Sequence, residues 1–157
     1  RDVYRSRGLE RYEISNYAKP GYHSRHNALY WTGGEYLALG TGATGFVRTR
    51  ADRGLRFTNH RSAERYLAAV EQGELPEAQR EELGPEELME ERIAMGLRLG
   101  SGVDIAAVCE QFGVDPRDRL GKAKLFEDRG YMRRIGTRWA LTDEGADVHS
   151  AISARLM

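Results

Sequence analysis

The pattern of the sequence changes near residue 60, and this change limits the folds that the chain can adopt. Residues 1–60 hold much of the aromatic content, together with short apolar runs that end in glycine-containing turns. Such runs favour short strands in an α/β sheet or at a barrel edge. From Ser62 onward, apolar residues recur at helical spacing and glycines mark the expected helix ends. The sequence therefore predicts a mixed, helix-rich α+β fold.

Four short segments of the first part are candidate strands. Tyr12–Ile14 is the first, and the apolar run Glu35–Gly40 is the second. Val47–Arg50 and Arg56–Asn59 are expected to pair as a hairpin that turns around Asp52, Arg53 and Gly54. These segments are short enough to be edge or barrel strands.

A helix and an acidic linker are expected over residues 61–84. Ser62 is a plausible N-cap and Gly73 a plausible end of this helix. Residues 71–91 hold nine glutamates and one arginine. Pro76 interrupts this stretch, so we expect a linker whose charges face the solvent.

The remaining residues, 85–157, predict a winged-helix-like domain. Met89, Ile93, Gly96 and Leu97 lie on one face of a helix that starts at Pro85. The elements expected after it are a short helix capped by Asp104, a helix from Pro116 to Arg129, a hairpin from Tyr131 to Leu141 and a helix capped by Thr142. Three helices, a hairpin and a further helix is close to the order of elements in a winged helix.

Composition excludes several classes of protein. The single cysteine, Cys109, rules out a disulfide within the chain and a zinc site built from several cysteines, and its apolar neighbours predict a place in the core. Lys plus Arg is 24 and Asp plus Glu is 24, so the neutral chain has no net charge to attract nucleic acid or an anionic membrane. No apolar run approaches the ~20 residues of a membrane helix, and no secretory leader is visible, so we expect a cytoplasmic protein.

Two pairs of motifs resemble one known family. The run YEISNYAKPGYHSRHNALYW (Tyr12–Trp31) and the run EYLALGTGATGF (Glu35–Phe46) resemble the oxygen-independent coproporphyrinogen III oxidase-like family of radical S-adenosylmethionine (SAM) proteins. Glu90–Gly113 and Leu141–Gly145 resemble the helical C-terminal domain of that family. The resemblance implies that residues 1–60 are the last strands of a radical SAM barrel and that 85–157 are the C-terminal domain.

The hexapeptide from His26 to Trp31 carries an HNxxYW signature, which is typical of the haem chaperone branch of the family. The resemblance implies that the protein binds haem and delivers it to respiratory proteins. It also implies that His26 ligates the haem iron and that Asn27, Tyr30 and Trp31 contact the porphyrin, because neutral imidazole is a usual axial ligand. The alternative is that these side chains only pack a loop against the barrel. His23 is a second candidate ligand.

The resemblance also implies a [4Fe–4S] cluster and SAM in the full-length protein. The cysteine motif that holds this cluster is absent here, and the cluster needs thiolate ligands. We therefore expect this chain alone to hold no cluster and to catalyse no radical reaction. Gly40 and Gly42 are expected to border the SAM site of the full-length protein, or else to form a plain tight turn. Glu13 either bonds an amine of SAM or substrate, or pairs with Arg11.

Partners follow from the same resemblance. We expect the N-terminal barrel portion of the same protein and a haem-receiving respiratory protein, and a homodimer is possible through unpaired strand edges. A second interpretation is a C-terminal fragment of a coproporphyrinogen III oxidase of porphyrin biosynthesis. A third is a nucleic-acid-binding winged helix, since residues 115–138 hold eight Lys or Arg and four acidic residues, a net of +4. We expect no DNA binding, because these cations can instead complement the acidic stretch or the barrel.

Overall fold

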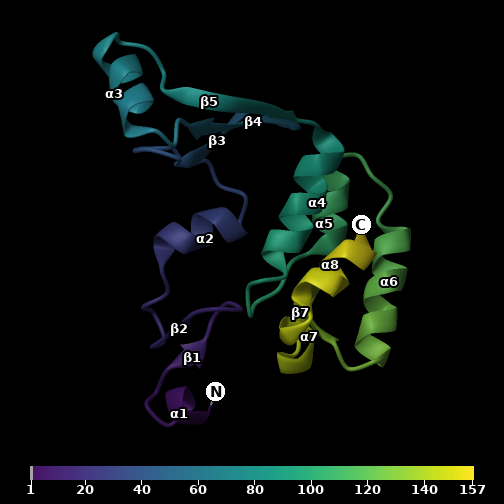
Figure 1. Cartoon of the computed structure of the whole chain (residues 1–157). Coiled ribbons are helices and arrows are strands. Elements are labelled where there is room, and N and C mark those ends of the chain that lie inside the picture. Colours follow the sequence, from purple (N-terminus) through teal and green to yellow (C-terminus); the bar gives the residue numbers. More distant parts are fainter. Residues whose placement is uncertain (1) are drawn as a thin grey trace. The chain divides into compact units, whose positions relative to one another are not determined.

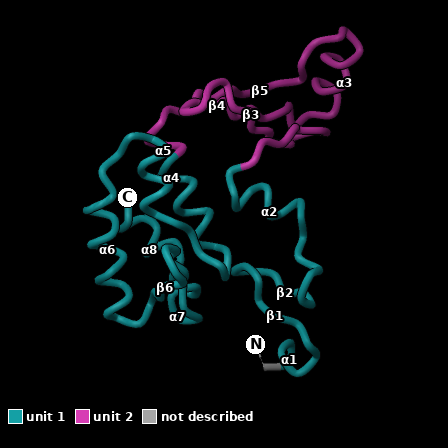
Figure 2. The backbone as a smooth tube through the Cα atoms, turned by 180° about the vertical axis from the view of Figure 1, so that it is seen from behind, with its two compact units in different colours: residues 1–33, 89–157 teal, residues 34–88 magenta. Residues whose placement is uncertain are grey.

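The computed structural model describes residues 2–157, and these residues divide into two compact units. One unit holds the chain up to Gly33 together with Met89–Met157, and the other holds Gly34–Leu88 (Figure 2). Helices occur together with small antiparallel sheets, which confirms the predicted mixed α+β class (Figure 1). The predicted domains 1–60, 61–84 and 85–157 refer to pieces of a longer protein, and their boundaries stay a prediction. Within the described residues, no helix is long and apolar enough to cross a bilayer.

A three-stranded antiparallel sheet forms the centre of the unit of residues 34–88. Its strands are β3 (Thr44–Arg50), β4 (Arg53–Asn59) and β5 (Glu77–Leu83), in the order β3-β4-β5. β3 and β4 form the predicted hairpin, but its turn is at Ala51 and Asp52, and the expected turn residues Arg53 and Gly54 belong to β4 and pair with β3. A Cβ atom at Gly54 would collide with the ring of Phe46 on the facing strand, so glycine allows the two strands to pack at this point.

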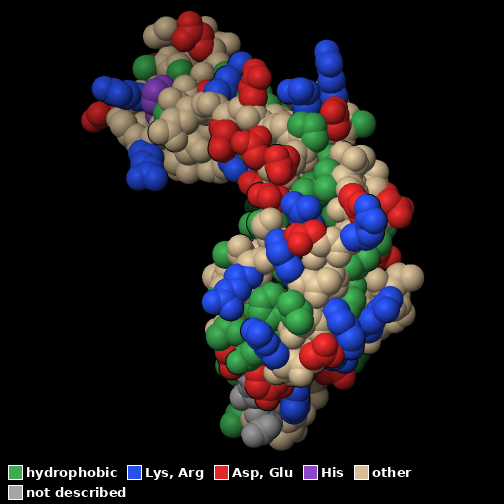
Figure 3. Space-filling view, turned by 90° about the vertical axis from the view of Figure 1, so that its right-hand side faces the viewer, with side chains coloured by type: hydrophobic (Ala, Val, Ile, Leu, Met, Phe, Trp, Pro, Cys, Tyr) green, Lys and Arg blue, Asp and Glu red, His purple; other side chains and the backbone are tan. Residues whose placement is uncertain are grey.

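The interpretation of the acidic stretch as a linker is wrong over β5. This segment pairs with β4 along its length, and Arg56 forms an ion pair with Glu81 across the two strands, with 3.1 Å between Nη1 and Oε2. The side chains of β5 are exposed except at its ends, where Glu77 is partly covered and Leu83 is buried. Because this edge strand buries almost no side chain, its sequence lacks the apolar alternation that reveals a strand. The prediction that its glutamates face the solvent is confirmed for Glu81 and Glu82 but not for Glu77, whose side chain is only 14% exposed; Figure 3 shows acidic side chains on the surface of the molecule.

The expected strand at Glu35–Gly40 is also wrong. Only Tyr36 pairs, through an isolated bridge to Phe46, and the rest of the run is irregular. Leu37 and Leu39 are 74% and 84% exposed, so the apolar character of this run does not reflect burial within the described residues. The helix predicted after Ser62 is confirmed as α3 (Ala63–Glu71), with the Ser62 hydroxyl as its N-cap.

The helical core lies in the other unit. Its helices are α4 (Pro85–Gly96), whose first residues belong to the sheet unit, α5 (Ile105–Gln111) and α6 (Arg117–Asp128), followed by the hairpin of β6 (Met132–Ile135) and β7 (Arg138–Leu141). All of these elements were expected from the sequence. Met89 and Ile93 on the buried face of α4, together with Leu97 directly after it, belong to one core cluster with Ile105 and Cys109 of α5. Figure 1 shows α6 beside the C-terminal helix that completes this core.

The single helix expected after Thr142 is wrong in one respect, because it is broken at Val148. Its two parts are α7 (Asp143–Asp147) and α8 (His149–Leu156). The Thr142 hydroxyl accepts a hydrogen bond from the Gly145 N–H at 3.1 Å, so the predicted cap is present. The order of elements matches the expected one, and the description as a winged helix remains an interpretation.

The N-terminal segment runs irregularly before it reaches a short helix. Its elements are α1 (Asp2–Arg5), the paired two-residue strands β1 (Glu10–Arg11) and β2 (Tyr17–Ala18), and α2 (Arg25–Trp31). The strand expected at Tyr12–Ile14 is reduced to an isolated bridge between Glu13 and Leu99. This bridge fastens the N-terminal segment to the loop that follows α4.

Candidate functional site

The HNxxYW hexapeptide lies within α2, so its side chains are held on one short helix. The Ser24 hydroxyl caps the helix by accepting a hydrogen bond from the Asn27 backbone N–H at 3.2 Å. At the other end, the Thr32 hydroxyl donates to the Ala28 carbonyl at 2.7 Å. Asn27 therefore takes part in the N-cap of the helix through its backbone N–H.

His26 and Tyr30 lie one helical turn apart and contact each other. The Tyr30 hydroxyl is 3.0 Å from Nε2 of His26, and the two rings meet edge to face with centroids 5.1 Å apart. The imidazole is exposed to solvent. Depending on the tautomer, Nε2 either accepts from the hydroxyl or donates to it, so one ring nitrogen carries a lone pair in the neutral form. The predicted ligand is therefore accessible and has one polar partner.

Trp31 is held differently from the other members of the motif. The guanidinium of Arg98 lies over its indole ring, with 4.3 Å between Cζ and the ring centroid. Trp31 is partly buried, and Arg98 covers one face of the ring. This contact makes Trp31 an anchor that fastens α2 to the loop after α4.

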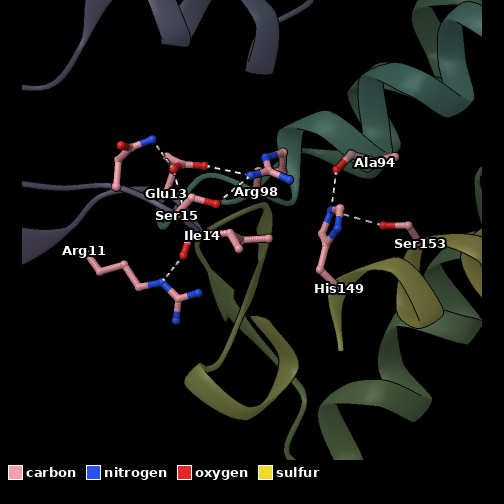
Figure 4. A network of polar contacts seen from close by, with 9 residues as sticks. Arg11, Glu13, Ile14, Ser15, Ala94, Arg98, His149 and Ser153 are labelled. Carbon is pink, nitrogen blue, oxygen red and sulfur yellow. Dashed lines mark hydrogen bonds and ion pairs between the residues drawn. The ribbon is translucent and has the colours of Figure 1, made fainter. Parts of the chain in front are cut away.

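Arg98 is itself fixed by a buried carboxylate, as Figure 4 shows. Glu13 is 1% exposed, and its Oε2 accepts from Nη2 of Arg98 at 3.2 Å. The other oxygen, Oε1, accepts from the Ser15 N–H at 2.7 Å and from the Asn16 amide at 2.6 Å. Glu13 thus accepts three hydrogen bonds, one of them from the ion-paired Arg98, so both of its buried oxygens have partners. The expected pairing of Glu13 with Arg11 is wrong, since the carboxylate pairs with Arg98 instead.

His23, the alternative ligand, is engaged by an aromatic partner. Its ring stacks on Tyr12 with 4.4 Å between the centroids and 11° between the planes. The Tyr12 hydroxyl accepts a hydrogen bond from the Ser24 N–H at 3.4 Å. This stack fixes the orientation of His23, whereas the His26 ring meets the side chain of Tyr30 edge to face.

Gly40 and Gly42 lie in the sheet unit and form a tight turn. Their φ angles are +97° and +67°, in the left-handed region that favours glycine. Gly40 donates its N–H to the Tyr66 hydroxyl at 3.1 Å, and its carbonyl accepts from the buried amide of Asn59 at 3.0 Å. Gly42 donates its N–H to the His60 carbonyl at 2.9 Å, so neighbouring residues of the same unit hold both glycines of the turn.

Cysteine ligation of a cluster does not fit this chain. Cys109 is fully buried in the helical core, and burial raises the pKa of its thiol. Among the described residues, no group of three or more His, Cys, Asp or Glu side chains is arranged to hold a metal ion. A [4Fe–4S] cluster would need thiolates from elsewhere.

Most of the cations of residues 115–138 interact within the chain. Arg117 pairs with Asp115, Lys122 with Asp118, and Lys124 with Glu127 and Asp128. Arg119 is buried and lies 3.6 Å from Glu90. Ion pairs within the chain thus engage four of the eight cations of this region.

Three residues of this region were missed by sequence reasoning. Tyr22 and Leu29 are 79% and 42% exposed and add apolar surface to the segment around His26. Leu29 stands three residues after His26, and this spacing was a usable signal. Arg98 had no such signal, because it lies far from the motif in the sequence and meets it only in the folded chain.

Comparison with known proteins gives one family. Residues 83–148 match the HemN C-terminal domain family. The haem chaperone HemW of Bacillus subtilis is 34% identical over 106 residues, which are 68% of this chain and 27% of that protein. HemW of Escherichia coli is 33% identical over 144 residues, 88% of this chain and 35% of that protein. The mitochondrial radical S-adenosyl methionine domain-containing protein 1 of mouse is 39% identical over 106 residues, 66% of this chain and 24% of that protein.

A solved structure supports the fold. Coproporphyrinogen III oxidase (HemN) from Escherichia coli, a radical SAM enzyme, matches 99% of this chain and 38% of its own, with a TM-score of 0.69 and 11% sequence identity. At this identity the match concerns the fold alone. The chain spans between 24% and 40% of the length of its curated bacterial and mitochondrial relatives.

Proposed function

Because the chain belongs to the HemW branch of the HemN-like radical SAM proteins, we propose that it is the haem-binding portion of a chaperone that delivers haem to respiratory proteins. The names of the bacterial relatives support this proposal. The observation that carries it is the exposed imidazole of His26, presented on a capped helix with Tyr30 as its polar partner.

The side chains around His26 fit a haem in their chemistry. Bound haem supplies an iron that takes one neutral imidazole nitrogen as a ligand. Tyr22, Leu29 and Tyr30 supply apolar and aromatic surface, and Arg25 is an exposed cation beside His26. Covering ~100 Å² of porphyrin gives ~2.5 kcal/mol before ordering costs. The bond to the imidazole is therefore expected to decide affinity and specificity.

Tyr30 limits the availability of the imidazole. When Nε2 is held by the Tyr30 hydroxyl, that nitrogen must give up its hydrogen bond before it binds iron. Removal of the hydroxyl frees the nitrogen and keeps the aromatic ring. Tyr30→Phe is therefore expected to bind haem at least as tightly as the wild type, whereas Tyr30→Ala loses apolar contact and binds more weakly.

Trp31 has a different role in this proposal. Because Arg98 covers one face of its ring, Trp31 holds α2 in place, and its effect on haem is mainly through the position of that helix. Trp31→Leu is expected to lower haem affinity less than His26→Ala. The Asn27 backbone supports the same helix through the Ser24 cap.

A haemin titration followed at the Soret band tests the proposal. His26→Ala is compared with His23→Ala, since each variant loses one imidazole and the two positions are three residues apart. Loss of about tenfold or more in affinity is expected only for His26→Ala, as an iron ligand would require. Equal affinity of wild type and His26→Ala would refute the ligand assignment. Loss of the band only in His23→Ala would move the ligand to His23.

The wider functions belong to the whole protein. The cluster and SAM are proposed to lie in a barrel portion of the same protein, which would cover the strand edges of this chain, and Gly40 and Gly42 are proposed to border the SAM site there. The homodimer, the cytoplasmic location and the absence of DNA binding stay predictions. The likeness to a coproporphyrinogen III oxidase concerns the fold, so it adds no support to oxidase activity.

A further inference from the structure

A cavity of about 440 Å³ lies in the helical unit, away from the exposed imidazole of His26 on α2. Its walls come from β1 and the residues that follow it, from the loop after α4, and from the junction of β7 with α7. Parts of this wall are visible in Figure 4, where Arg11 and Ile14 lie close to the loop that carries Arg98. The volume lies in the range of small-molecule sites.

The arginines that line the cavity differ in how many carboxylates they pair with. Arg98 is held by Glu13, whereas Arg5 and Arg11 share a single carboxylate, Asp143, at 3.3 and 3.6 Å. Arg133 also lines the cavity, and it makes no ion pair with another described residue. Among the described residues of the lining, four arginines stand against three acidic residues, the third being Glu10, which gives these residues a net charge of +1.

Arg11 presents an unused hydrogen-bond donor. Its side chain is 15% exposed, and its Nε donates to the Ile14 carbonyl at 2.9 Å. Nη1 is buried and makes no hydrogen bond among the described residues, because Asp143 lies at ion-pair distance only. A buried guanidinium nitrogen that makes no hydrogen bond is unfavourable even beside a carboxylate at ion-pair distance, so an oxygen atom placed within hydrogen-bond distance of it would stabilise the site.

Apolar side chains complete the cavity. Leu97 and Leu141 are buried, and Ile14 packs against the same core. A ligand with both an anionic group and an apolar part would therefore find a counterpart for each. A net lining charge of +1 suits one carboxylate better than a phosphate dianion, which needs more uncompensated cations.

From these observations we propose that the cavity binds a monocarboxylate with a short apolar chain. The carboxylate lies against Arg11 and Arg133, and the chain lies against Leu97 and Leu141. The proposal concerns a second ligand and does not depend on haem binding at His26.

The test uses octanoate as the probe, with the full chain and NMR detection of backbone amides. Octanoate is expected to shift the amides of Ile14, Leu141 and Thr142 in a saturable manner, and 1-octanol, which has no charge, is expected to bind much more weakly. Inorganic phosphate tests the anion alone and is expected to shift these amides little. Equal binding of octanoate and octanol, or no saturable shift at these amides, would overturn the proposal.

Arg133→Gln and Arg134→Gln form a matched pair of variants. Both residues are exposed on β6, but Arg134 lies over the Trp139 ring and lines a different hollow. Octanoate affinity is expected to fall about tenfold in Arg133→Gln, the loss of one charge-assisted contact, and to stay unchanged in Arg134→Gln. An equal change of octanoate affinity in the two variants would contradict the placement of the carboxylate against Arg133. Haemin affinity is expected to be unchanged in Arg133→Gln, so this proposal and the haem proposal can fail separately.

Discussion

The Arg98 guanidinium lies over the Trp31 ring while its Nη2 bonds the buried carboxylate of Glu13, at 4.3 Å from the ring centroid and 3.2 Å from the oxygen. One side chain thus joins α2, the segment after β1 and the loop after α4. This relationship connects stability to the proposed function, because it fixes α2 through Trp31.

Removal of the Arg98 charge is expected to destabilise the chain strongly. Arg98→Met leaves the Glu13 carboxylate buried without its counter-ion, which costs about 3 kcal/mol. Urea unfolding followed by circular dichroism measures this loss. Arg5→Met is the control, since the Arg5 side chain is 62% exposed and its ion pair contributes at most about 1 kcal/mol. Equal midpoints for Arg98→Met and wild type would contradict the structural role of the pair.

Two glycines in the helical unit are expected to respond to alanine in opposite directions. A Cβ atom at Gly145 would collide with the Tyr131 carbonyl, so Gly145→Ala forces the backbone apart and destabilises the chain. Gly121 lies inside α6, where an added Cβ meets no atom within 4 Å, so Gly121→Ala should stabilise by about 0.5–1 kcal/mol. The thermal unfolding midpoints of both variants test this prediction. A higher midpoint for Gly145→Ala than for the wild type would contradict the close approach of Gly145 in α7 to the Tyr131 carbonyl.

His149 is expected to make stability depend on pH. Burial is the largest cause that lowers the pKa of its imidazole, and the charge of Arg98 also lowers it, against a hydrogen bond to the Ala94 carbonyl at 2.9 Å. The unfolded chain therefore takes up a proton at higher pH than the folded chain. Stability is fully present above about pH 6.5 and falls as the pH drops below it, until the folded-state pKa is passed.

The loss of stability that His149 causes at low pH has an upper limit, and a variant at this position serves as its control. One proton contributes at most about 1.4 kcal/mol for each pH unit. His149→Gln keeps a donor for the Ala94 carbonyl and removes the titration, so its stability should fall less between about pH 6.5 and 5 than that of the wild type. An NMR titration that places the folded-state pKa of His149 above that of a free imidazole would contradict the sign of this effect.

The parts of the fold that can be predicted from the sequence are those fixed by interactions between residues close together in the chain. The caps at Ser62, Asp104 and Thr142 follow from short-range hydrogen bonds, and all three side chains accept the expected backbone N–H. The strand β5 escaped notice because an exposed edge strand needs no apolar face. The break between α7 and α8 at Val148 was also missed, because the apolar residues on both sides of it keep helical spacing.

The candidate site shows the same division. The sequence indicated His26 and its neighbours as one group, and the helix α2 does hold them together. It gave no indication that Arg98 would lie on Trp31, because residues far apart in the sequence meet only through the packing of α4. The cavity beside Arg11 likewise depends on three segments that are distant in the chain.

The most direct measurement of the central claim is rescue of the lost ligand by free imidazole. His26→Gly removes the proposed ligand and leaves space on α2, and His23→Gly is the matched control. With haemin bound, His26→Gly is predicted to have an altered Soret band that returns to the wild-type position when imidazole is added, whereas His23→Gly keeps the wild-type band throughout. Haemin with imidazole in the absence of protein corrects for the free complex. A wild-type band in His26→Gly before any imidazole is added would contradict the proposal that His26 binds the haem iron.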